Sequence, residues 1–324
     1  MRAVVYEQYG GPDVLRFTEV TTPVPGASEV LIRIHATTVA SADWRVRSLN
    51  VPPGFGLLAR LALGITGPRQ PILGTELSGV VTSVGSEVTK FKPGDAVFAF
   101  PGVAMRCHAE YRCMSQDAAV ALKPANVGHA EAAALSFGGT TALHFLRQAK
   151  LAAGEQVLVN GASGSVGVAA VQLAKHFGAE VTAVCSAGNA DLVRSLGAAH
   201  VIDYTTEDFT RSGRTYDVIV DTAGTAPFRR SRASLRERGR LLIVLGGMRD
   251  LLSIPWIALT DSRKVIGGTA SGSAEDLRLL ADLVERQELE PVIDRMYRFD
   301  ELVEAHRYVD TGRKKGSVVI TLEH

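Results

Sequence analysis

The stretch Val157-Leu158-Val159-Asn160-Gly161-Ala162-Ser163-Gly164-Ser165-Val166-Gly167 is an apolar, β-type run that leads directly into a glycine-rich turn. Apolar residues continue after it at positions 166, 170, 173 and 177, which is the spacing of one helix face. A strand, a glycine turn and a helix in this order are typical of a dinucleotide-binding βα unit. The helix N-terminus presents unpaired N–H groups and the positive end of its dipole to a pyrophosphate. The stretch therefore predicts a dinucleotide site, and the next question is which redox chemistry it serves.

Strands and helices alternate around this turn. We expect strands at 156–160, 180–185, 200–203, 218–221 and 240–245, and helices at 165–177 and 190–196. Near-continuous apolar runs such as 218–220 suit strands that are buried on both faces. This alternation indicates an α/β class with a doubly wound parallel sheet, which we assign to residues 121–265.

The segments on either side have a different pattern. Residues 1–120 contain short strand-like runs, for example 30–36, 77–84 and 95–100, separated by proline and glycine turns. Residues 266–324 contain two predicted helices, 274–286 and 301–310, and a final strand at 317–322. Because the chain closes in β structure, we expect 266–324 to join residues 1–120 in one domain, with residues 121–265 inserted.

Composition narrows the class of partner and the compartment. The chain of 324 residues is 46% hydrophobic and 21% charged, with a net charge of +1, so nothing attracts nucleic acid or an anionic membrane over long range. The longest apolar run, 251–259, is too short for a membrane span and contains Ser253 and Pro255. The N-terminus has the pattern of a strand and not of a signal peptide. Three cysteines without a CxxC motif favour a reducing, cytoplasmic location.

Several further motifs follow one another along the chain. They are PILGTELSGVV at 71–81, FKPGDAV at 91–97, AEY at 109–111, GTTA at 139–142, LGA at 196–198, VIDY at 201–204 and YDVI at 216–219. In this order and spacing the chain resembles the medium-chain dehydrogenase/reductase superfamily, specifically its zinc-free quinone oxidoreductase-like branch. The resemblance implies a GroES-like β domain, an inserted Rossmann domain and an active-site cleft between them.

The second predicted strand bears on the choice of cofactor. An NAD site needs an acid about 20 residues after the glycines, yet this strand ends in Ser186-Ala187-Gly188-Asn189. Ser186, Asn189 and the cation of Arg194 suit a 2′-phosphate, and the resemblance puts Tyr204 against it. Arg194 is alternatively a solvated helix charge, and Tyr204 a half-buried aromatic at a strand end. We expect NADPH in preference to NADH, bound through its pyrophosphate on residues 161–167.

The resemblance implies three further cofactor contacts. It puts Thr141 near the nicotinamide ribose or the pyrophosphate, and Leu245 and Gly246 near the nicotinamide. The family's C-terminal Gly-Lys pair is Gly316-Ser317 here. Either Lys315 supplies the missing charge, or Lys314 and Lys315 are surface charges.

Zinc ligands are missing at the positions where zinc relatives carry them. Residues 38–43 contain no cysteine, and Thr75 occupies the histidine position of the Gly-His-Glu motif. A catalytic zinc needs three protein ligands and an open position. Cys107, His108 and Cys113 do not have finger spacing, and a four-cysteine lobe is absent. We expect no metal.

Without a Lewis acid, the reaction that remains available is hydride transfer to an electron-poor acceptor. Such an acceptor is a quinone or an α,β-unsaturated carbonyl, which the protein orients. The resemblance puts Asp43 at the floor of the cleft, where it either binds a substrate oxygen through water or caps a helix. Arg47 either steers the substrate or is a solvated helix charge. The apolar, glycine-rich segment 52–68 is either a mobile lid or a surface that packs against a partner subunit.

Two other functions stay open. One is a zinc-type alcohol dehydrogenase, against which the missing ligands argue. The other is a crystallin-like or scaffold protein that binds NADPH without turnover, because a Rossmann site binds its cofactor whether or not a substrate pocket works. Whichever function the chain has, we expect a homodimer. The predicted edge strand 264–270, near the apolar run 251–259, needs to be covered by another chain.

Overall fold

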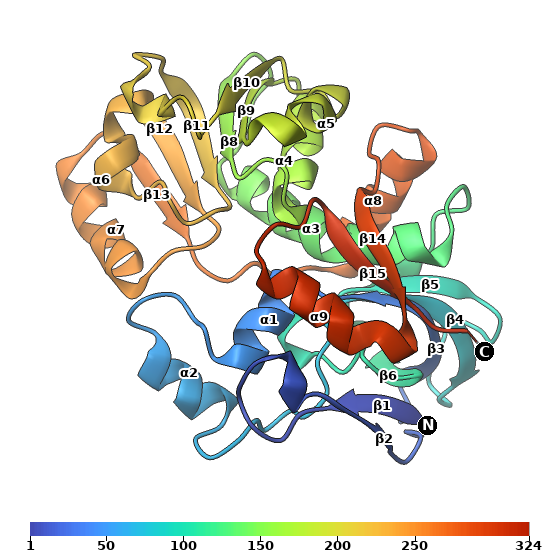
Figure 1. Ribbon diagram of the computed structural model, residues 1–324. Coiled ribbons are helices and arrows are strands. Elements are labelled where there is room, and N and C mark those ends of the chain that lie inside the picture. The colour runs from blue at the N-terminus through green and yellow to red at the C-terminus, as the bar shows by residue number, and fades with distance from the viewer. Residues whose placement is uncertain (324) are drawn as a thin grey trace.

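Two large sheets organise the chain, and the computed structural model describes residues 1–323 (Figure 1). The first sheet is wholly parallel and has the strand order β10-β9-β8-β11-β12-β13. Its strands are β8 (Gln156–Asn160), β9 (Glu180–Cys185), β10 (His200–Asp203), β11 (Tyr216–Asp221), β12 (Leu235–Ile243) and β13 (Lys264–Gly267). The order reverses between β8 and β11, which is the switch point of a doubly wound sheet, so the predicted fold class is confirmed.

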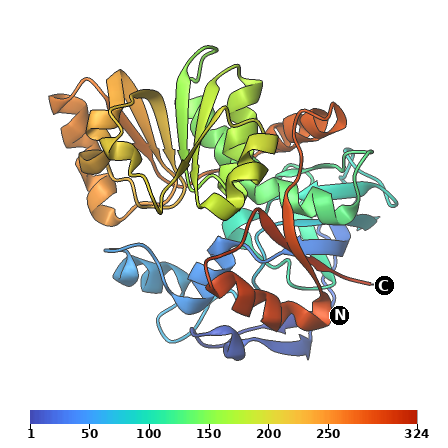
Figure 2. The same ribbon diagram turned by 45° about the horizontal axis from the view of Figure 1, so that its top comes forward.

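Helices cover both faces of this parallel sheet (Figure 2). They are α3 (His129–Gln148), α4 (Ser165–His176), α5 (Ala190–Ser195), α6 (Phe228–Ser231) and α7 (Met248–Thr260). Val157 and Val159 of β8 pack into the core that α3 and α4 cover, whereas Leu158 packs on the other face with Ile257 of α7. These three side chains are fully buried, which explains why the centre of the strand is apolar on both faces.

The second sheet has the order β14-β15-β3-β4-β5-β7, with β6 also paired to β3. Its strands are β3 (Glu29–Thr38), β4 (Leu77–Val84), β5 (Ala96–Ala99), β6 (Tyr111–Ser115), β7 (Val120–Leu122), β14 (Ile293–Arg298) and β15 (Ser317–Thr321). Strand β15 pairs antiparallel with β3, with Val319 opposite Thr38. The last part of the chain thus returns to the first domain, and the parallel sheet is inserted between the two parts. The boundaries at 120/121 and 265/266 stay predictions.

The remaining elements lie around this second sheet (Figure 1). They are the ribbon β1 (Arg2–Val5) and β2 (Arg16–Glu19), and the helices α1 (Ser41–Ser48), α2 (Gly56–Leu63), α8 (Ala274–Glu285) and α9 (Leu302–Asp310). The apolar run 251–259 belongs to α7, which tolerates Pro255 inside it. Within residues 1–323, no helix combines the length and the apolarity that crossing a membrane requires.

Candidate functional site

The glycine turn connects the end of β8 to the start of α4. Gly161 has φ +81°, a left-handed conformation that favours glycine. A Cβ on Gly167 would lie 2.2 Å from the Gly161 carbonyl oxygen, so only glycine lets the helix approach the turn this closely. Gly164 precedes α4 and no side chain caps the first turn of this 12-residue helix. The turn therefore presents open N–H groups at a helix N-terminus, which fits a pyrophosphate.

The loop after β9 lies against this turn. Nδ2 of Asn189 donates to Oγ of Ser163 at 3.0 Å and to Oγ of Ser186 at 3.3 Å. The structure thus brings together three of the residues that we assigned to the cofactor from the sequence. Ala162 of the turn is fully buried, and Val166 is half-buried against the core.

One carboxylate near this loop has no counterpart among the sequence-based candidates. Asp203 ends β10 and accepts hydrogen bonds from the Thr205 N–H and hydroxyl, at 3.0 and 2.8 Å. These two bonds, together with the Ala187 N–H, lower the pKa of Asp203 and keep it ionised. A negative charge therefore lies beside the Ser186 loop, although it comes from the third strand and not from the second.

Two of the assigned residues lie at the surface beyond the loop. Arg194 is exposed and pairs with Asp191 at 3.0 Å within α5. Tyr204 is 63% exposed, so the half-buried alternative for this ring is wrong.

The C-terminal segment reaches the glycine turn through a lysine that we did not assign. Lys314 Nζ donates to Ser165 Oγ at 2.6 Å and to the Gly316 carbonyl at 2.7 Å. Ser165 Oγ in turn donates to the Gly316 carbonyl, and the Gly316 N–H donates to the Ser163 carbonyl. Lys315 is exposed, so Lys314 and not Lys315 stands at the cofactor turn. Burial lowers the pKa of Lys314 to about 8, and Glu76 partly offsets this effect.

Thr141 lies buried on α3, where this helix meets α4. A Cβ on Gly138, three residues earlier, would lie 2.4 Å from the Ser165 carbonyl oxygen. Gly138, just before the GTTA motif, thus lets α3 lie close to the start of α4.

A pocket of about 660 Å³ opens at the carboxyl ends of β11 and β12. Leu245 and Gly246 line it, together with Ala223 and Gly224. Its opposite wall is 52–54, where the Pro53 carbonyl accepts from the Met248 N–H at 2.9 Å. The segment 52–68 therefore reaches across to the start of α7. Ligands of open α/β sheets bind at this end of the strands, so the pocket is the candidate site for an acceptor.

Asp43 is fully buried and has a structural role. Its two carboxylate oxygens accept from the Ala40 and Gly74 N–H groups, each at 2.8 Å. The first bond caps α1, so the helix-cap alternative is confirmed, and burial raises the pKa of this carboxyl group. With both oxygens bonded to the backbone and shielded from solvent, Asp43 does not contact a substrate.

Arg47 is also fully buried, which contradicts both interpretations that we made for it. Its Nη2 lies 2.6 and 2.7 Å from the carboxylate oxygens of Asp310 on α9. The side chain joins α1 to α9 and neither steers a substrate nor faces solvent.

The positions that carry zinc ligands in zinc relatives hold a different arrangement. Thr75 is buried, and the carboxylate of Glu76 accepts from the Thr38 hydroxyl and from the Phe137 N–H. Burial raises the pKa of Glu76 to about 7. His108 is buried with Nε2 2.9 Å from the Thr38 carbonyl oxygen. Across residues 1–323, no three His, Cys, Asp or Glu side chains are grouped so as to hold a metal ion.

Comparison with known proteins agrees with this architecture. Residues 26–154 match the model of the alcohol dehydrogenase GroES-like domain, and residues 196–320 match the model of the zinc-binding dehydrogenase family. The quinone-oxidoreductase QR1 of Triphysaria versicolor is 33% identical over 99% of this chain and 98% of its own. The 2-methylene-furan-3-one reductase of Solanum lycopersicum is 34% identical over 99% of this chain and 79% of its own. Among solved structures, the quinone oxidoreductase from Coxiella burnetii superimposes with a TM-score of 0.89 at 30% identity, covering 100% and 99% of the two chains.

Proposed function

Because the chain belongs to the medium-chain dehydrogenase/reductase superfamily, in its quinone oxidoreductase-like branch, we propose that it transfers a hydride from NADPH to a quinone or an α,β-unsaturated carbonyl without a metal. The observation that carries the proposal is the pocket of about 660 Å³ at the carboxyl ends of β11 and β12, in the same sheet as the glycine turn. A second relative is named for a substrate with a methylene group next to a ketone, which belongs to the proposed acceptor class.

The residues present fit a dinucleotide. Open N–H groups at Ser165–Gly167 and the ammonium group of Lys314 would hold the pyrophosphate, and Thr141 lies on the helix beside them. Leu245 and Gly246 line the pocket in which the nicotinamide would lie. The bound cofactor supplies the hydride.

The preference for NADPH rests on the loop after β9. Ser186 and Asn189 already share a hydrogen bond there, and both offer donors to a 2′-phosphate. Arg194 and the exposed ring of Tyr204 lie on the next elements and would complete the site. No carboxylate occupies the end of β9 itself, where an NAD site requires one to bind the ribose hydroxyls.

In the acceptor pocket, the protein contributes position and exclusion of water. The strap at 52–54 closes one side of the pocket, and the backbone at 245–247 forms the other. A conjugated acceptor spreads the incoming charge over its own oxygen, so proximity and orientation are the main contributions required. The resulting enolate or hydroquinone monoanion takes its proton from water, because Asp43 is enclosed and bonded to the backbone.

The purified protein, incubated with 1,2-naphthoquinone or an alkenal, tests this function through the oxidation of NADPH and, separately, of NADH. We expect turnover with both acceptor classes, tighter binding of NADPH, and no loss of activity after EDTA treatment. Elemental analysis is expected to find no stoichiometric zinc. Absence of turnover with any acceptor despite tight NADPH binding would instead indicate a non-catalytic NADPH-binding protein, and stoichiometric zinc would indicate an alcohol dehydrogenase.

We also propose that the protein is a cytoplasmic homodimer. Strand β13 is an edge of the parallel sheet, and α7 beside it exposes Leu252, Trp256 and Leu259, at 72%, 70% and 82%. An apolar edge of this kind needs a cover, and a second copy supplies one. The three cysteines are free thiols, which fits a reducing compartment. Fractionation of the native host tests the location.

A further inference from the structure

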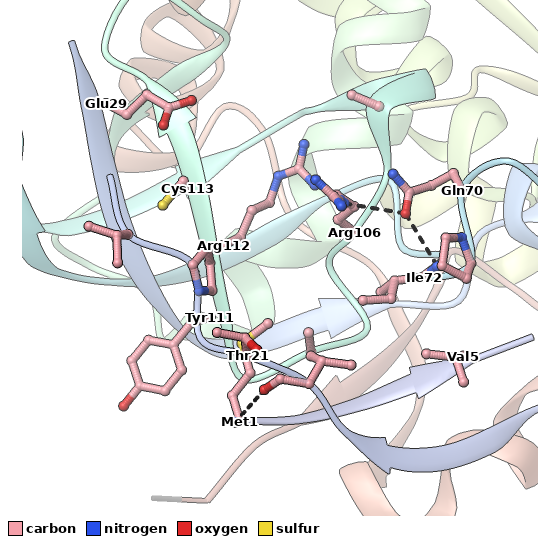
Figure 3. A pocket seen from close by; sticks show the side chains of 16 residues that line it. Met1, Val5, Thr21, Glu29, Gln70, Ile72, Arg106, Tyr111, Arg112 and Cys113 are labelled. Carbon is pink, nitrogen blue, oxygen red and sulfur yellow. Dashed lines mark hydrogen bonds between the residues drawn. The ribbon is translucent and has the colours of Figure 1, made fainter. Parts of the chain in front are cut away.

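A second pocket, of about 630 Å³, lies in the GroES-like domain between the ribbon of β1 and β2, strand β6 and the loop at 104–106 (Figure 3). Its volume is within the ordinary range of small-molecule sites. It shares no lining residue with the pocket at the ends of β11 and β12. The proposed redox function does not use it.

Two arginines meet in this pocket, and neither forms an ion pair within residues 1–323, although the charge of Glu29 acts to raise the pKa of Arg112. Figure 3 shows the guanidinium groups of Arg106 and Arg112 next to each other. Arg112 is 8% exposed, and its Nε and Nη1 have no hydrogen-bond partner within residues 1–323. Nε of Arg106 donates to a neutral amide oxygen, Gln70 Oε1, at 3.3 Å. Burial lowers the pKa of Arg112, and the charge of Arg106 lowers it further. A buried guanidinium beside an exposed one of the same sign is stabilised by an anion that binds between them.

The nearest carboxylate among the lining residues does not fill this role. Oε2 of Glu29 accepts from the Gly26 N–H at 2.9 Å and so faces its own turn. Figure 3 shows Glu29 and Gln70 at opposite ends of the pocket. Gln70 Oε1 also accepts from the Ile72 N–H, so its amide N–H₂ group stays available as another donor.

The backbone at Arg106 is held in an unusual conformation. Met105 and Arg106 have φ values of +50° and +73°, which side chains with a Cβ rarely adopt. Two consecutive left-handed residues carry strain, and strain of this kind is concentrated at binding sites. Here it turns the loop so that the Arg106 side chain reaches Gln70 and the pocket.

Apolar side chains form one wall of the pocket, although Thr21 and Tyr111 also line it. Val5, Val20, Pro71 and Ile72 form the wall beside the two arginines. A site with a paired cationic end and an aliphatic wall matches an amphiphilic anion, because guanidinium groups bind carboxylate and phosphate oxygens in a forked geometry. We propose that this pocket binds a small organic anion, with its carboxylate or phosphate group between Arg106 and Arg112 and its aliphatic part against Val5 and Ile72.

Calorimetric titration of the untagged protein, saturated with NADPH, tests the site with octanoate, octyl phosphate, inorganic phosphate and octanol. We expect saturable binding of one octanoate or octyl phosphate per chain, with octanol weaker by roughly tenfold or more, since a charge-assisted hydrogen bond is lost. The tighter of the two octyl anions identifies the headgroup, and inorganic phosphate measures the headgroup alone.

Variants locate the bound anion. Arg106→Gln, at an exposed position, is expected to weaken octanoate and octyl phosphate roughly tenfold, and Arg112→Gln at least as much. Arg16→Gln on β2, whose side chain is 70% exposed outside the pocket, is the matched control and leaves the affinity unchanged. An unchanged NADPH affinity verifies that each variant is folded. If Arg112→Gln does not fold, the result for Arg106→Gln is sufficient to test the proposal. Octanol binding as tightly as octanoate, unchanged affinity in Arg106→Gln, or displacement of the anion by NADPH would each overturn the proposal.

Discussion

The ammonium nitrogen of Lys314 lies 2.6 Å from the hydroxyl oxygen of Ser165, although 149 positions separate the two residues in the chain. Ser165 is the first residue of α4, so a half-buried cation lies at the positive end of a helix dipole. Charge and dipole oppose each other in this arrangement. A pyrophosphate bound at the turn would neutralise both positive ends. The contact between Lys314 and Ser165 is therefore expected to affect the affinity for the cofactor.

Replacing Lys314 with Met is expected to weaken NADPH binding roughly 10- to 100-fold, because one charge-assisted hydrogen bond to the cofactor is lost. Lys315→Met removes an exposed lysine one position later and is the matched control. Fluorescence titration of NADPH measures both variants. Equal losses in the two variants would show that net charge, and not the position of Lys314, determines the affinity.

The affinity of the wild-type protein for NADPH is expected to fall as the pH rises through about 8, where Lys314 loses its proton. Below this pH the ammonium group is charged and attracts phosphate; above it the amine is neutral. Lys314→Met removes the group that titrates, so its affinity should not have this slope. Parallel pH profiles for the two proteins would refute the assignment.

An acid at the end of β9 should reverse the cofactor preference. Ser186→Asp places a carboxylate where it repels a 2′-phosphate and accepts from ribose hydroxyls, so the ratio of NADPH to NADH affinity should fall roughly 100-fold. Ser195→Asp on the exposed face of α5 adds the same charge elsewhere. Asp203→Asn, which removes the charge beside the Ser186 loop, is expected to change the ratio in the opposite direction. An unchanged ratio in Ser186→Asp contradicts the proposed 2′-phosphate site.

Glu76 should make the protein less stable as the pH rises from about 4.5 to 7. Its pKa is about 7 in the folded protein, against an ordinary value of 4.5, so the folded state binds more protons in this window. Glu76→Gln should remove roughly 1–3 kcal/mol of this dependence, measured by urea unfolding at both ends of the window. The amide also fits the site, because its oxygen can accept from Phe137 while its nitrogen donates to Thr38.

The comparison of the wild-type protein with Glu76→Gln cancels other groups that titrate in the same window. The buried residues His108 and His306 have lowered pKa values and act in the opposite direction, but they are common to both proteins. Glu87→Gln, at an exposed position, is the control and should follow the wild type. Identical slopes in the wild type and Glu76→Gln would show that Glu76 is ionised throughout.

The proposed dimer depends on the exposed face of α7. Trp256→Glu places a charge at a side chain that is 70% exposed, and we expect it to convert the dimer to a monomer in light scattering. Val103→Glu adds the same charge at another exposed apolar side chain, which is 85% exposed and lies outside α7. This control variant should leave the dimer intact. A monomeric wild type contradicts the interface.

The parallel sheet was readable from the sequence because its strands are buried on both faces. Strands β8, β9 and β10 agree with their predicted ranges to the residue, and the apolar runs at the centres of β8 and β9 are buried. Strand β12 begins at Leu235, five residues before the predicted start at 240. Its first part is rich in charged residues, and Arg236 pairs with Asp217 of the neighbouring strand, which no local pattern can indicate.

The candidate site was predictable where it depends on local backbone and unpredictable where it depends on distant partners. The glycine turn is a local feature, and it has the conformation that its glycines indicate. Arg47 has the spacing of an exposed helix residue. In the structure its side chain is buried and pairs with Asp310, which lies 263 positions away in the chain. The choice between Lys314 and Lys315 depends on contacts with the distant glycine turn, where the Gly316 N–H donates to the Ser163 carbonyl and Lys314 donates to Ser165.

The insertion of one domain in the other has a consequence for synthesis of the chain. The last strand of the parallel sheet ends at Gly267, so a ribosome completes the whole nucleotide-binding sheet before it reaches Lys314. Strand β15, which holds that lysine's segment against β3, is made later still. A nascent chain therefore carries the glycine turn before Lys314 exists, and if Lys314 binds the cofactor as proposed, the chain gains its full affinity only after synthesis has passed this residue.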